Sequence, residues 1–185
     1  MPQLRKDPLS DRWVILAEGR EERPNEFERR GLRKSGLRCP FCAGNESDTP
    51  PAIVTYGPAD GDHAGGGGDD GPWSVRVVPN KYPALVPHGR MEPVRLGLYE
   101  QSDAVGGHEV IVESPRHVSS LSELTLEEAC LLMRAYRDRL RVLRSETQYR
   151  YALIFKNVGP EAGASLEHAH SQLVATQMIP VEVQQ

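Results

Sequence analysis

Six short runs of β-branched and aromatic residues, bounded by Gly, Pro, Asn or Asp, are the feature that most limits what this chain can fold into. The runs are Trp13–Ala17, Ala52–Tyr56, Trp73–Val78, Glu109–Glu113, Arg150–Lys156 and Gln172–Thr176. Runs of this length and composition are typical of strands. The chain also has 17 Gly and 15 Pro, which cluster between the runs. We therefore expect short strands of an antiparallel sheet, joined by long loops.

A single strong helix signal lies between the fourth and fifth runs. Apolar residues recur there at helical spacing, namely Leu126, Ala129, Cys130, Met133, Tyr136, Leu140 and Leu143. Such spacing predicts one buried face, with the arginines of the segment on the other face. Thr125 followed by Glu128 forms a capping box at the start. The pattern predicts a helix over about 125–146, and with the strands it indicates the α+β class.

The length of the chain indicates one domain, and its hydropathy and charge argue against membrane and nucleic-acid partners. The chain has 185 residues, with 22 Lys+Arg against 26 Asp+Glu and a net charge of −4. This is enough chain for one core. No apolar run approaches the roughly 20 residues of a membrane span, and the first residues lack the apolar stretch of about 7–15 residues of a secretory signal. We expect a cytoplasmic protein without a membrane partner, and the absence of a Lys/Arg block argues against nucleic-acid binding.

The sequence Cys39-Pro-Phe-Cys42 indicates a metal site. Two thiolates at this spacing in a tight turn can share one tetrahedral ion. A redox pair is the alternative, but such pairs precede a helix, whereas Gly44 and Pro50-Pro51 follow here. A closed zinc site needs two more ligands, usually histidines. Spacing alone does not choose among the six candidates, which are His63, His88, His108, His117, His168 and His170.

The segment from Asn157 to Gln172 lies between two predicted strands. On an extended backbone His168 and His170 project from the same face, because side chains alternate with period two. One interpretation is a metal-binding or solvent-facing pair of histidines. The other is catalytic, with one imidazole as nucleophile, the other as ligand or orienting group, and Gln172 as a donor to a phosphoryl oxygen. The spacing leaves both interpretations open.

Four motifs in combination resemble a known family. They are Cys-Pro-x-Cys, Ser-Pro-x-His, Asn-x-Gly with Gly-x-Ser, and His-x-His-x-Gln. In this order the chain resembles the galactose-1-phosphate uridylyltransferase branch of the histidine-triad superfamily. The resemblance implies a histidine-triad-like antiparallel sheet, or half-barrel, with one main helix packed on it. It further implies one nucleotidylyltransferase domain over residues 1–185, similar to the family's N-terminal repeat and without the second repeat, in a homodimer.

The same resemblance implies roles for individual residues. His170 corresponds to the nucleophile that attacks the α-phosphorus, and Gln172 to a glutamine that hydrogen-bonds the phosphoryl group. The ligands of a structural metal, zinc with iron as the alternative, correspond to Cys39, Cys42, His117 and His168. Positions that contact nucleotide or phosphate correspond to Asn80, Asn157, Gly163, Ser165, Arg20 and Arg23. Outside this set, we expect Cys130 in the core and His63, His88 and His108 to be structural or solvated.

The activity implied is UDP-glucose:hexose-1-phosphate uridylyl transfer, a reaction of galactose metabolism. It proceeds by a ping-pong mechanism through a nucleotidyl-histidine, and needs no catalytic magnesium.

The uridylyltransferases best matching the pattern have Pro between the two histidines, where this chain has Ala169. A related branch that moves the adenylyl group of ADP-glucose to phosphate also lacks this proline, so it is the first alternative. A catalytically silent, zinc-stabilised nucleotide-binding module is the second. Hydrolysis is disfavoured because Gln172, unlike a third histidine, cannot protonate a leaving group.

Overall fold

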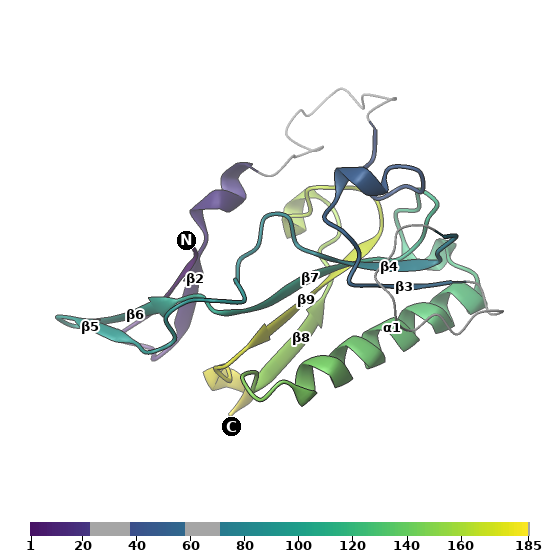
Figure 1. Ribbon diagram of the computed structural model, residues 1–185. Coiled ribbons are helices and arrows are strands. Elements are labelled where there is room, and N and C mark those ends of the chain that lie inside the picture. Colours follow the sequence, from purple (N-terminus) through teal and green to yellow (C-terminus); the bar gives the residue numbers. More distant parts are fainter. Residues whose placement is uncertain (23–37, 58–70, 185) are drawn as a thin grey trace.

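The computed structural model describes residues 1–22, 38–57 and 71–184, which form two antiparallel sheets and one α-helix (Figure 1). The strands are β1 (Gln3–Lys6), β2 (Trp13–Leu16), β3 (Val54–Tyr56), β4 (Val75–Pro79), β5 (Val94–Leu96), β6 (Tyr99–Asp103), β7 (Gly106–Val112), β8 (Tyr151–Phe155) and β9 (His170–Thr176). The helices are α1 (Leu126–Ser145) and the short 3-10 helices η1 (Glu18–Glu22), η2 (Glu46–Asp48), η3 (Leu121–Glu123), η4 (Pro160–Ala162) and η5 (Val181–Val183). The expected α+β class is confirmed.

The larger sheet has five strands in the order β3-β4-β7-β9-β8, and every neighbouring pair is antiparallel. Its centre is the pairing of β7 with β9, in which Val110 lies opposite Gln172 and Val112 lies opposite His170. Because side chains alternate along a strand, these four residues share one face of the sheet. The histidine-containing segment is therefore held in the middle of the sheet.

The two faces of this sheet pack against different partners. On one face Val75, Val77, Ile111 and Leu173 pack against α1, and this cluster forms the main core. On the opposite face Val78, Val110 and Val112 pack with Ala52, Trp73 and Phe41. Figure 1 shows α1 along one side of the sheet and the segment containing η2 on the other. The Cys-containing segment thus covers the face to which His170 belongs.

The helix is confirmed, and its predicted buried face is correct in the C-terminal half and wrong in the N-terminal half. Thr125 accepts from the backbone of Glu128, and the Glu128 side chain accepts from the backbone of Thr125, as the capping box requires. Leu143 is buried, and Tyr136 and Leu140 pack against the core, as predicted. The exposed residues of the predicted face are Leu126, Cys130 and Met133, and the other buried residues of α1 are Leu132, Ala135 and Arg139. Arg139 was expected on the outer face, but its guanidinium pairs with the buried Glu109 of β7 at 2.6 Å. An arginine can face the core when a carboxylate there compensates its charge.

All six predicted strands are present, with shifted ends. The run predicted at Glu109–Glu113 is β7, which begins earlier, at Gly106, because its ladder with β9 continues to the pair Gly106 and Thr176. At Gly106 a Cβ atom would lie 2.3 Å from the carbonyl oxygen of Ala175. The close approach of β9 therefore explains a glycine inside this strand.

The second sheet was not predicted as a unit. It has the order β2-β1-β6-β5 and projects from the larger sheet at the left of Figure 1. Of its four strands only β2 was expected. Strand β6 reads Tyr-Glu-Gln-Ser-Asp, which lacks the alternation of apolar and polar residues by which a strand is found in sequence. Its hydrogen-bonded pairing with β1 and β5, rather than its composition, makes it a strand.

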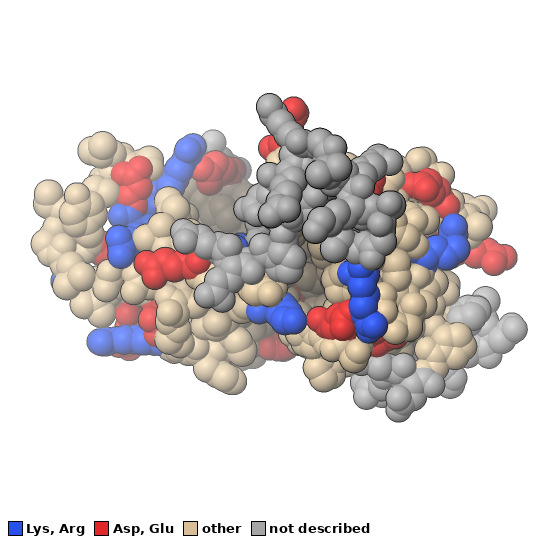
Figure 2. Space-filling view, turned by 90° about the horizontal axis from the view of Figure 1, so that it is seen from above, with Lys and Arg blue, Asp and Glu red and all other residues tan. Residues whose placement is uncertain are grey.

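Hydropathy and charge can be followed over the part of the chain that the structure describes. Among the described residues, no helix combines the length and apolar character needed to cross a membrane. In Figure 2, basic and acidic side chains are interspersed over the described part of the face seen from above.

Candidate active site

Four side chains from three parts of the chain converge in a candidate metal cluster. The ligand atoms of Cys39, Cys42, His117 and His168 all lie within 4.8 Å of one another. The Sγ atoms of Cys39 and Cys42 lie 3.5 and 3.6 Å from Nδ1 of His168, and Sγ of Cys42 lies 3.4 Å from Nδ1 of His117. In a tetrahedral zinc site the known bond lengths place S and N ligand atoms about 3.6 Å apart. The cluster therefore has the dimensions of a closed Cys2His2 site that could hold a metal ion.

His168 is oriented for metal binding by a second hydrogen bond. Its Nε2 lies 2.9 Å from the carbonyl oxygen of Ser114, which can only accept, so Nε2 carries the proton. Its Nδ1 then presents a lone pair to the two thiols. Burial lowers the pKa of His168 to about 4, against the bond to Ser114, which acts in the opposite direction. The imidazole is thus neutral at physiological pH, the form in which histidine binds metals.

The electrostatics of Cys39 also fit a bound cation. Burial raises the pKa of the Cys39 thiol to about 12, and the charge of Cys42 adds to this effect. Two thiolates side by side in a buried site are costly unless a positive charge compensates them. A divalent cation would supply that charge and deprotonate the thiols. The donor set, the distances and the neutral imidazole therefore all suit a structural metal.

Backbone hydrogen bonds hold the three ligand-bearing segments together. The amide of Ala43 donates to the carbonyl of Pro115, which joins the Cys segment to the loop that carries His117. The amide of Ala169 donates to the carbonyl of Val118, which joins the same loop to the start of β9. After Cys42 comes η2, a three-residue 3-10 helix, and the described residues there contain no α-helix of the kind that a redox Cys pair precedes.

His170, the predicted nucleophile, lies at the start of β9 beside the metal cluster. Its Nδ1 is 2.7 Å from the carbonyl oxygen of His168, so Nδ1 carries the proton and Nε2 is the basic atom. The Phe41 ring, from between the two cysteines, contacts the His170 ring with centroids 5.1 Å apart. His170 is buried, with 9% of its surface exposed. Its ring is therefore fixed both by the metal-binding strand and by the Cys segment.

A cavity of about 580 Å³ opens on this side of the sheet. Its lining includes His170 and Gln172 from β9, together with Asn80, Ser165 and Phe41. The volume lies within the range of about 300–1,000 Å³ that is usual for ligand sites. The structure thus brings three of the predicted nucleotide-contacting side chains, those of Asn80, Ser165 and Gln172, to one cavity with the predicted nucleophile.

A second, smaller cavity of about 300 Å³ is also lined by His170. Asn157 and Lys156 line it, as do His168 and Ser119. Asn157 is therefore near the predicted nucleophile but in a different cavity from Ser165. His170 lines both cavities, so there is space beside this residue.

The remaining predicted residues lie farther from this centre. Gly163 ends η4 with a φ of 75°, a turn position that favours glycine, and it lines neither cavity. Arg20 donates through Nη1 to the carbonyl of Tyr82 at 3.0 Å, and Tyr82 lines the larger cavity. Arg20 is thus adjacent to the cavity without lining it. Arg23 and His63 fall outside the described residues.

His108 contacts the predicted site residue Gln172, a relationship that the sequence interpretation did not include. It was expected to be structural or solvated, and it is buried in β7, where its Nε2 lies 3.0 Å from Oε1 of Gln172. One signal was available, because His108, Val110 and Val112 alternate along one strand and so share a face. The prediction began the strand at Glu109, one residue too late to include it.

A polar network on the opposite face of β9 supports the same strand. The carboxylate of Glu113, which is fully buried, accepts hydrogen bonds from Ser171, Tyr136 and Lys156. The hydroxyls of Tyr136 and Ser171 lie 2.5 Å apart. Burial raises the pKa of Tyr136 above that of an ordinary phenol, so its hydroxyl stays protonated and can donate a hydrogen bond. The network joins α1, β9 and the residue that follows β8, on the face of β9 opposite to His170.

Comparisons with known proteins show which sequences this chain resembles. The family model described as galactose-1-phosphate uridyl transferase, N-terminal domain, matches residues 69–180. ADP-glucose phosphorylase of Arabidopsis thaliana is 33% identical over 98% of this chain and 50% of its own length. Galactose-1-phosphate uridylyltransferase of Thermotoga maritima is 27% identical over 100% of this chain and 49% of its own length. The chain thus spans about half the length of these relatives.

Solved structures give the same result for the fold. A uridylyltransferase structure superposes with a TM-score of 0.66 and 29% identity, covering 98% of this chain and 48% of the other. The Arabidopsis thaliana ADP-glucose phosphorylase with bound ADP-glucose superposes with a TM-score of 0.63 and 30% identity, covering 100% of this chain and 51% of the other. At these values the similarity extends over essentially all of this chain.

Proposed function

This chain belongs to the galactose-1-phosphate uridyl transferase family, and we propose that it transfers a uridylyl group between UDP-glucose and a hexose 1-phosphate through a covalent intermediate on His170. The observation that carries the proposal is the hydrogen bond from Nδ1 of His170 to the carbonyl of His168. It leaves the lone pair on Nε2, on a buried ring that lines two cavities. A neutral, oriented imidazole with space beside it is what a nucleophilic histidine requires.

The reaction has two steps of the same kind. In the first, Nε2 of His170 bonds to the α-phosphorus of the nucleotide sugar, and the bond from that phosphorus to the bridging oxygen breaks, releasing glucose 1-phosphate. In the second, a phosphate oxygen of the acceptor hexose 1-phosphate attacks the same phosphorus and the N–P bond breaks. His170 returns to its neutral form. The covalent intermediate thus divides one difficult displacement into two easier ones.

Other side chains have binding roles in this scheme. Gln172 donates a hydrogen bond to an α-phosphoryl oxygen, where charge develops. The further contacts to nucleotide and phosphate are assigned to Asn80, Asn157, Gly163, Ser165, Arg20 and Arg23. The positions of Asn80 and Ser165 in the larger cavity support this assignment, as does Asn157 in the smaller one. The two arginines would neutralise phosphate charge through bidentate contacts.

The metal of the Cys39, Cys42, His117 and His168 cluster is assigned as zinc, with iron as the alternative. A set of two thiolates and two imidazoles fills all four tetrahedral positions, so its role is structural. It would hold the Cys segment and the start of β9 at a fixed distance. Metal analysis of the purified protein distinguishes zinc from iron directly.

The second candidate function is transfer of the adenylyl group of ADP-glucose to phosphate. Two observations favour it. Ala169 stands between the two histidines in place of proline, and the Arabidopsis ADP-glucose phosphorylase is more similar in sequence, at 33% identity, than the Thermotoga uridylyltransferase, at 27%. The mechanism on His170 is the same for both, and only the base and the acceptor differ.

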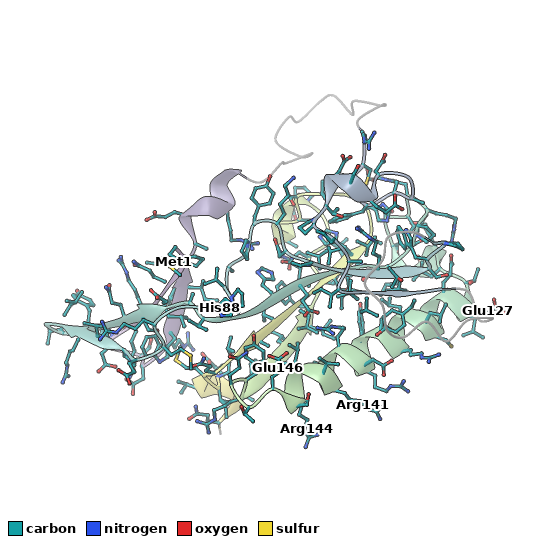
Figure 3. All side chains as sticks on the ribbon, viewed as in Figure 1. Met1, His88, Glu127, Arg141, Arg144 and Glu146 are labelled. Carbon is teal, nitrogen blue, oxygen red and sulfur yellow. The ribbon has the colours of Figure 1, made fainter. Side chains whose placement is uncertain are left out.

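Intact-mass measurement after incubation with UDP-glucose and, separately, with ADP-glucose tests both candidates. We expect a nucleotidyl adduct on the metal-loaded protein, whose mass identifies the base. His170→Ala should abolish it. His88→Ala is the matched control, since His88 is exposed and lies toward the smaller sheet (Figure 3), and it should form the adduct normally.

Two results would contradict the proposal. Labelling of His170→Ala at the wild-type rate would exclude this residue as the nucleophile. Binding of either nucleotide sugar without an adduct, in folded and metal-loaded protein, would indicate the silent nucleotide-binding module instead.

We also propose that the protein forms a homodimer and that it is cytoplasmic. The exposed apolar side chains of the smaller sheet, including Val14, Leu96 and Tyr99, support association with a second copy. Sedimentation measurements over a range of protein concentrations test the dimer, and fractionation of the source cells tests the location.

A further inference from the structure

His108 is buried beside the predicted phosphoryl-binding residue, and its protonation pattern is determined by a backbone group. The amide N–H of Ala84 points to Nδ1 of His108 at 2.8 Å. A backbone amide can only donate, so Nδ1 is the acceptor and carries no proton. The neutral ring of His108 therefore has its proton on Nε2.

That proton is directed at Gln172. Nε2 of His108 lies 3.0 Å from Oε1 of Gln172, and the amide of Asn80 approaches the same oxygen, with Nδ2 at 3.5 Å. The orientation of Asn80 is itself fixed, because its Oδ1 accepts from the backbone N–H of Tyr82 at 2.9 Å. Nδ2 of Asn80 and Nε2 of His108 are 3.0 Å apart, and both present hydrogens to the oxygen between them.

Only one orientation of the Gln172 amide satisfies these two donors. If the amide were flipped, its NH2 group would face N–H groups of His108 and Asn80 with no acceptor among them. With Oε1 toward His108, the NH2 group faces the other way. Within the described part of the chain no hydrogen bond is made by this NH2 group, and it is not among the buried polar atoms that lack a partner. It therefore faces the larger cavity, which Gln172 and His170 both line.

We propose that His108 is a positioning residue, which holds the NH2 group of Gln172 toward the phosphoryl oxygen of the nucleotide attached to His170. The inference rests on the proposed nucleotidyl transfer and adds to it. Gln172 is useful only as a donor, because a phosphoryl oxygen accepts hydrogen bonds and repels the carbonyl of a flipped amide. His108 thus reserves the donor end of the amide for the substrate before binding, so that no reorientation is needed during the reaction.

The test compares two replacements of His108 in the rate of nucleotidyl adduct formation. His108→Leu removes the donor, and we expect the rate constant at saturating nucleotide sugar to fall by about 10-fold to 10²-fold, up to the loss typical of one phosphoryl-stabilising donor. The concentration giving half the maximal rate should change little, since the base and sugar contacts remain. His108→Gln places an amide N–H near the position of the imidazole Nε2, and it should recover most of the rate.

Combination with Gln172→Ala separates positioning from a general structural effect. If His108 acts through Gln172, then His108→Leu in the Gln172→Ala background should cause no further loss of rate. If the two losses multiply, or if His108→Gln is as slow as His108→Leu, the inference is wrong. The melting temperature of each variant is measured in parallel, so that a folding defect is recognised as such.

The tautomer of His108 gives a readout that does not depend on activity. Long-range ¹H–¹⁵N correlation spectra of the metal-loaded wild-type protein should show the neutral tautomer with the proton on Nε2, and that signal should shift in Gln172→Ala. A proton on Nδ1 would overturn the inference even if adduct formation is normal. Absence of an adduct in the wild-type protein, with the expected tautomer present, would instead refute the proposed function and leave the geometry of His108 intact.

Discussion

The carbonyl oxygen of His168 lies 2.7 Å from Nδ1 of His170. One residue thus contributes its side chain to the candidate metal cluster and its backbone to the orientation of the predicted nucleophile. The cluster is closed and has no position for substrate. Its influence on the reaction must therefore pass through the position of the segment that carries His168 and leads into β9 at His170.

Loss of a metal ligand should reduce both stability and adduct formation. For Cys42→Ser we expect metal content well below one ion per chain, a lower melting temperature, and a rate of nucleotidylation at least about tenfold lower, as when groups supporting a metal site are removed. Structural zinc contributes about 10–16 kcal/mol of apparent binding free energy, so the loss in stability should be large. Cys130→Ser is the control, because Cys130 is an exposed cysteine of α1, and it should keep its metal. Full metal content in Cys42→Ser would remove Cys42 from the ligand set.

The pair between Arg139 and Glu109 should be important for stability. Both side chains are nearly buried, with 11% and 8% exposed, and two hydrogen bonds of 2.9 and 2.6 Å join them. Arg139→Met leaves Glu109 without its partner, and we expect the free energy of unfolding to fall by about 3–5 kcal/mol. Urea denaturation measures this. Arg141→Met is the control, since Arg141 is exposed and points away from the sheet (Figure 3). Equal losses in the two variants would contradict the inward role of Arg139.

The capping box of α1 should make stability depend on acid pH. The hydrogen bond from the backbone N–H of Thr125 lowers the pKa of Glu128 below its ordinary value of 4.5, and the Arg116 side chain lowers it further. A carboxyl whose pKa is lower in the folded state stabilises the fold above the ordinary value, and that contribution is lost as the pH falls through the lowered pKa.

Glu128→Gln should therefore lower the stability at neutral pH by about 0.5–2 kcal/mol, the range for helix caps, and should reduce the loss of stability on acidification. Thermal melts between pH 3 and pH 7, roughly the window set by the carboxyl groups, measure both effects. Glu127→Gln is the control, because Glu127 is exposed at the start of the same helix (Figure 3). An unchanged pH profile in Glu128→Gln would contradict the prediction.

Two neighbouring glycines of β7 should differ sharply on replacement by alanine. A Cβ atom at Gly106 would lie 2.3 Å from the backbone oxygen of Ala175, whereas at Gly107 the nearest atoms would lie at 3.6 Å. Gly106→Ala therefore forces β7 and β9 apart, at a cost of about 1–3 kcal/mol or more. Gly107→Ala should change the stability by less than about 1 kcal/mol. The melting temperatures of the two variants, measured under the same conditions, test this prediction. Similar values would mean that β7 and β9 do not approach this closely at Gly106.

The candidate site shows which features a sequence reveals and which it does not. The pair Cys39 and Cys42 and the pair His168 and His170 are visible in sequence, because their spacing is local and the chemistry of metals and nucleophiles limits the residue types. The choice of His117 and His168 as the other two ligands came from the resemblance to a family, since spacing left six histidines open. The structure supports the choice by bringing these four side chains together.

Alternation along β7 could place His108 on the same face as Val110, but it could not place His108 beside Gln172. Val110 and Gln172 face each other across β7 and β9, although more than sixty residues separate them in the chain, and His108 joins Gln172 only through this register. The same holds for β6, whose polar sequence becomes a strand by pairing with β1 and β5.

By itself the sequence determined the class of fold, the extent and cap of α1, and the set of side chains able to bind a metal or attack phosphorus. These depend on periodicity and residue chemistry, which are properties of short segments. Only the tertiary structure decided that Arg139 faces the core, that the cluster closes around two cysteines and two histidines, and that the amide of Gln172 has one orientation. Each of these depends on a partner distant in the chain, whose approach is set by strand register and by packing of the helix against the sheet.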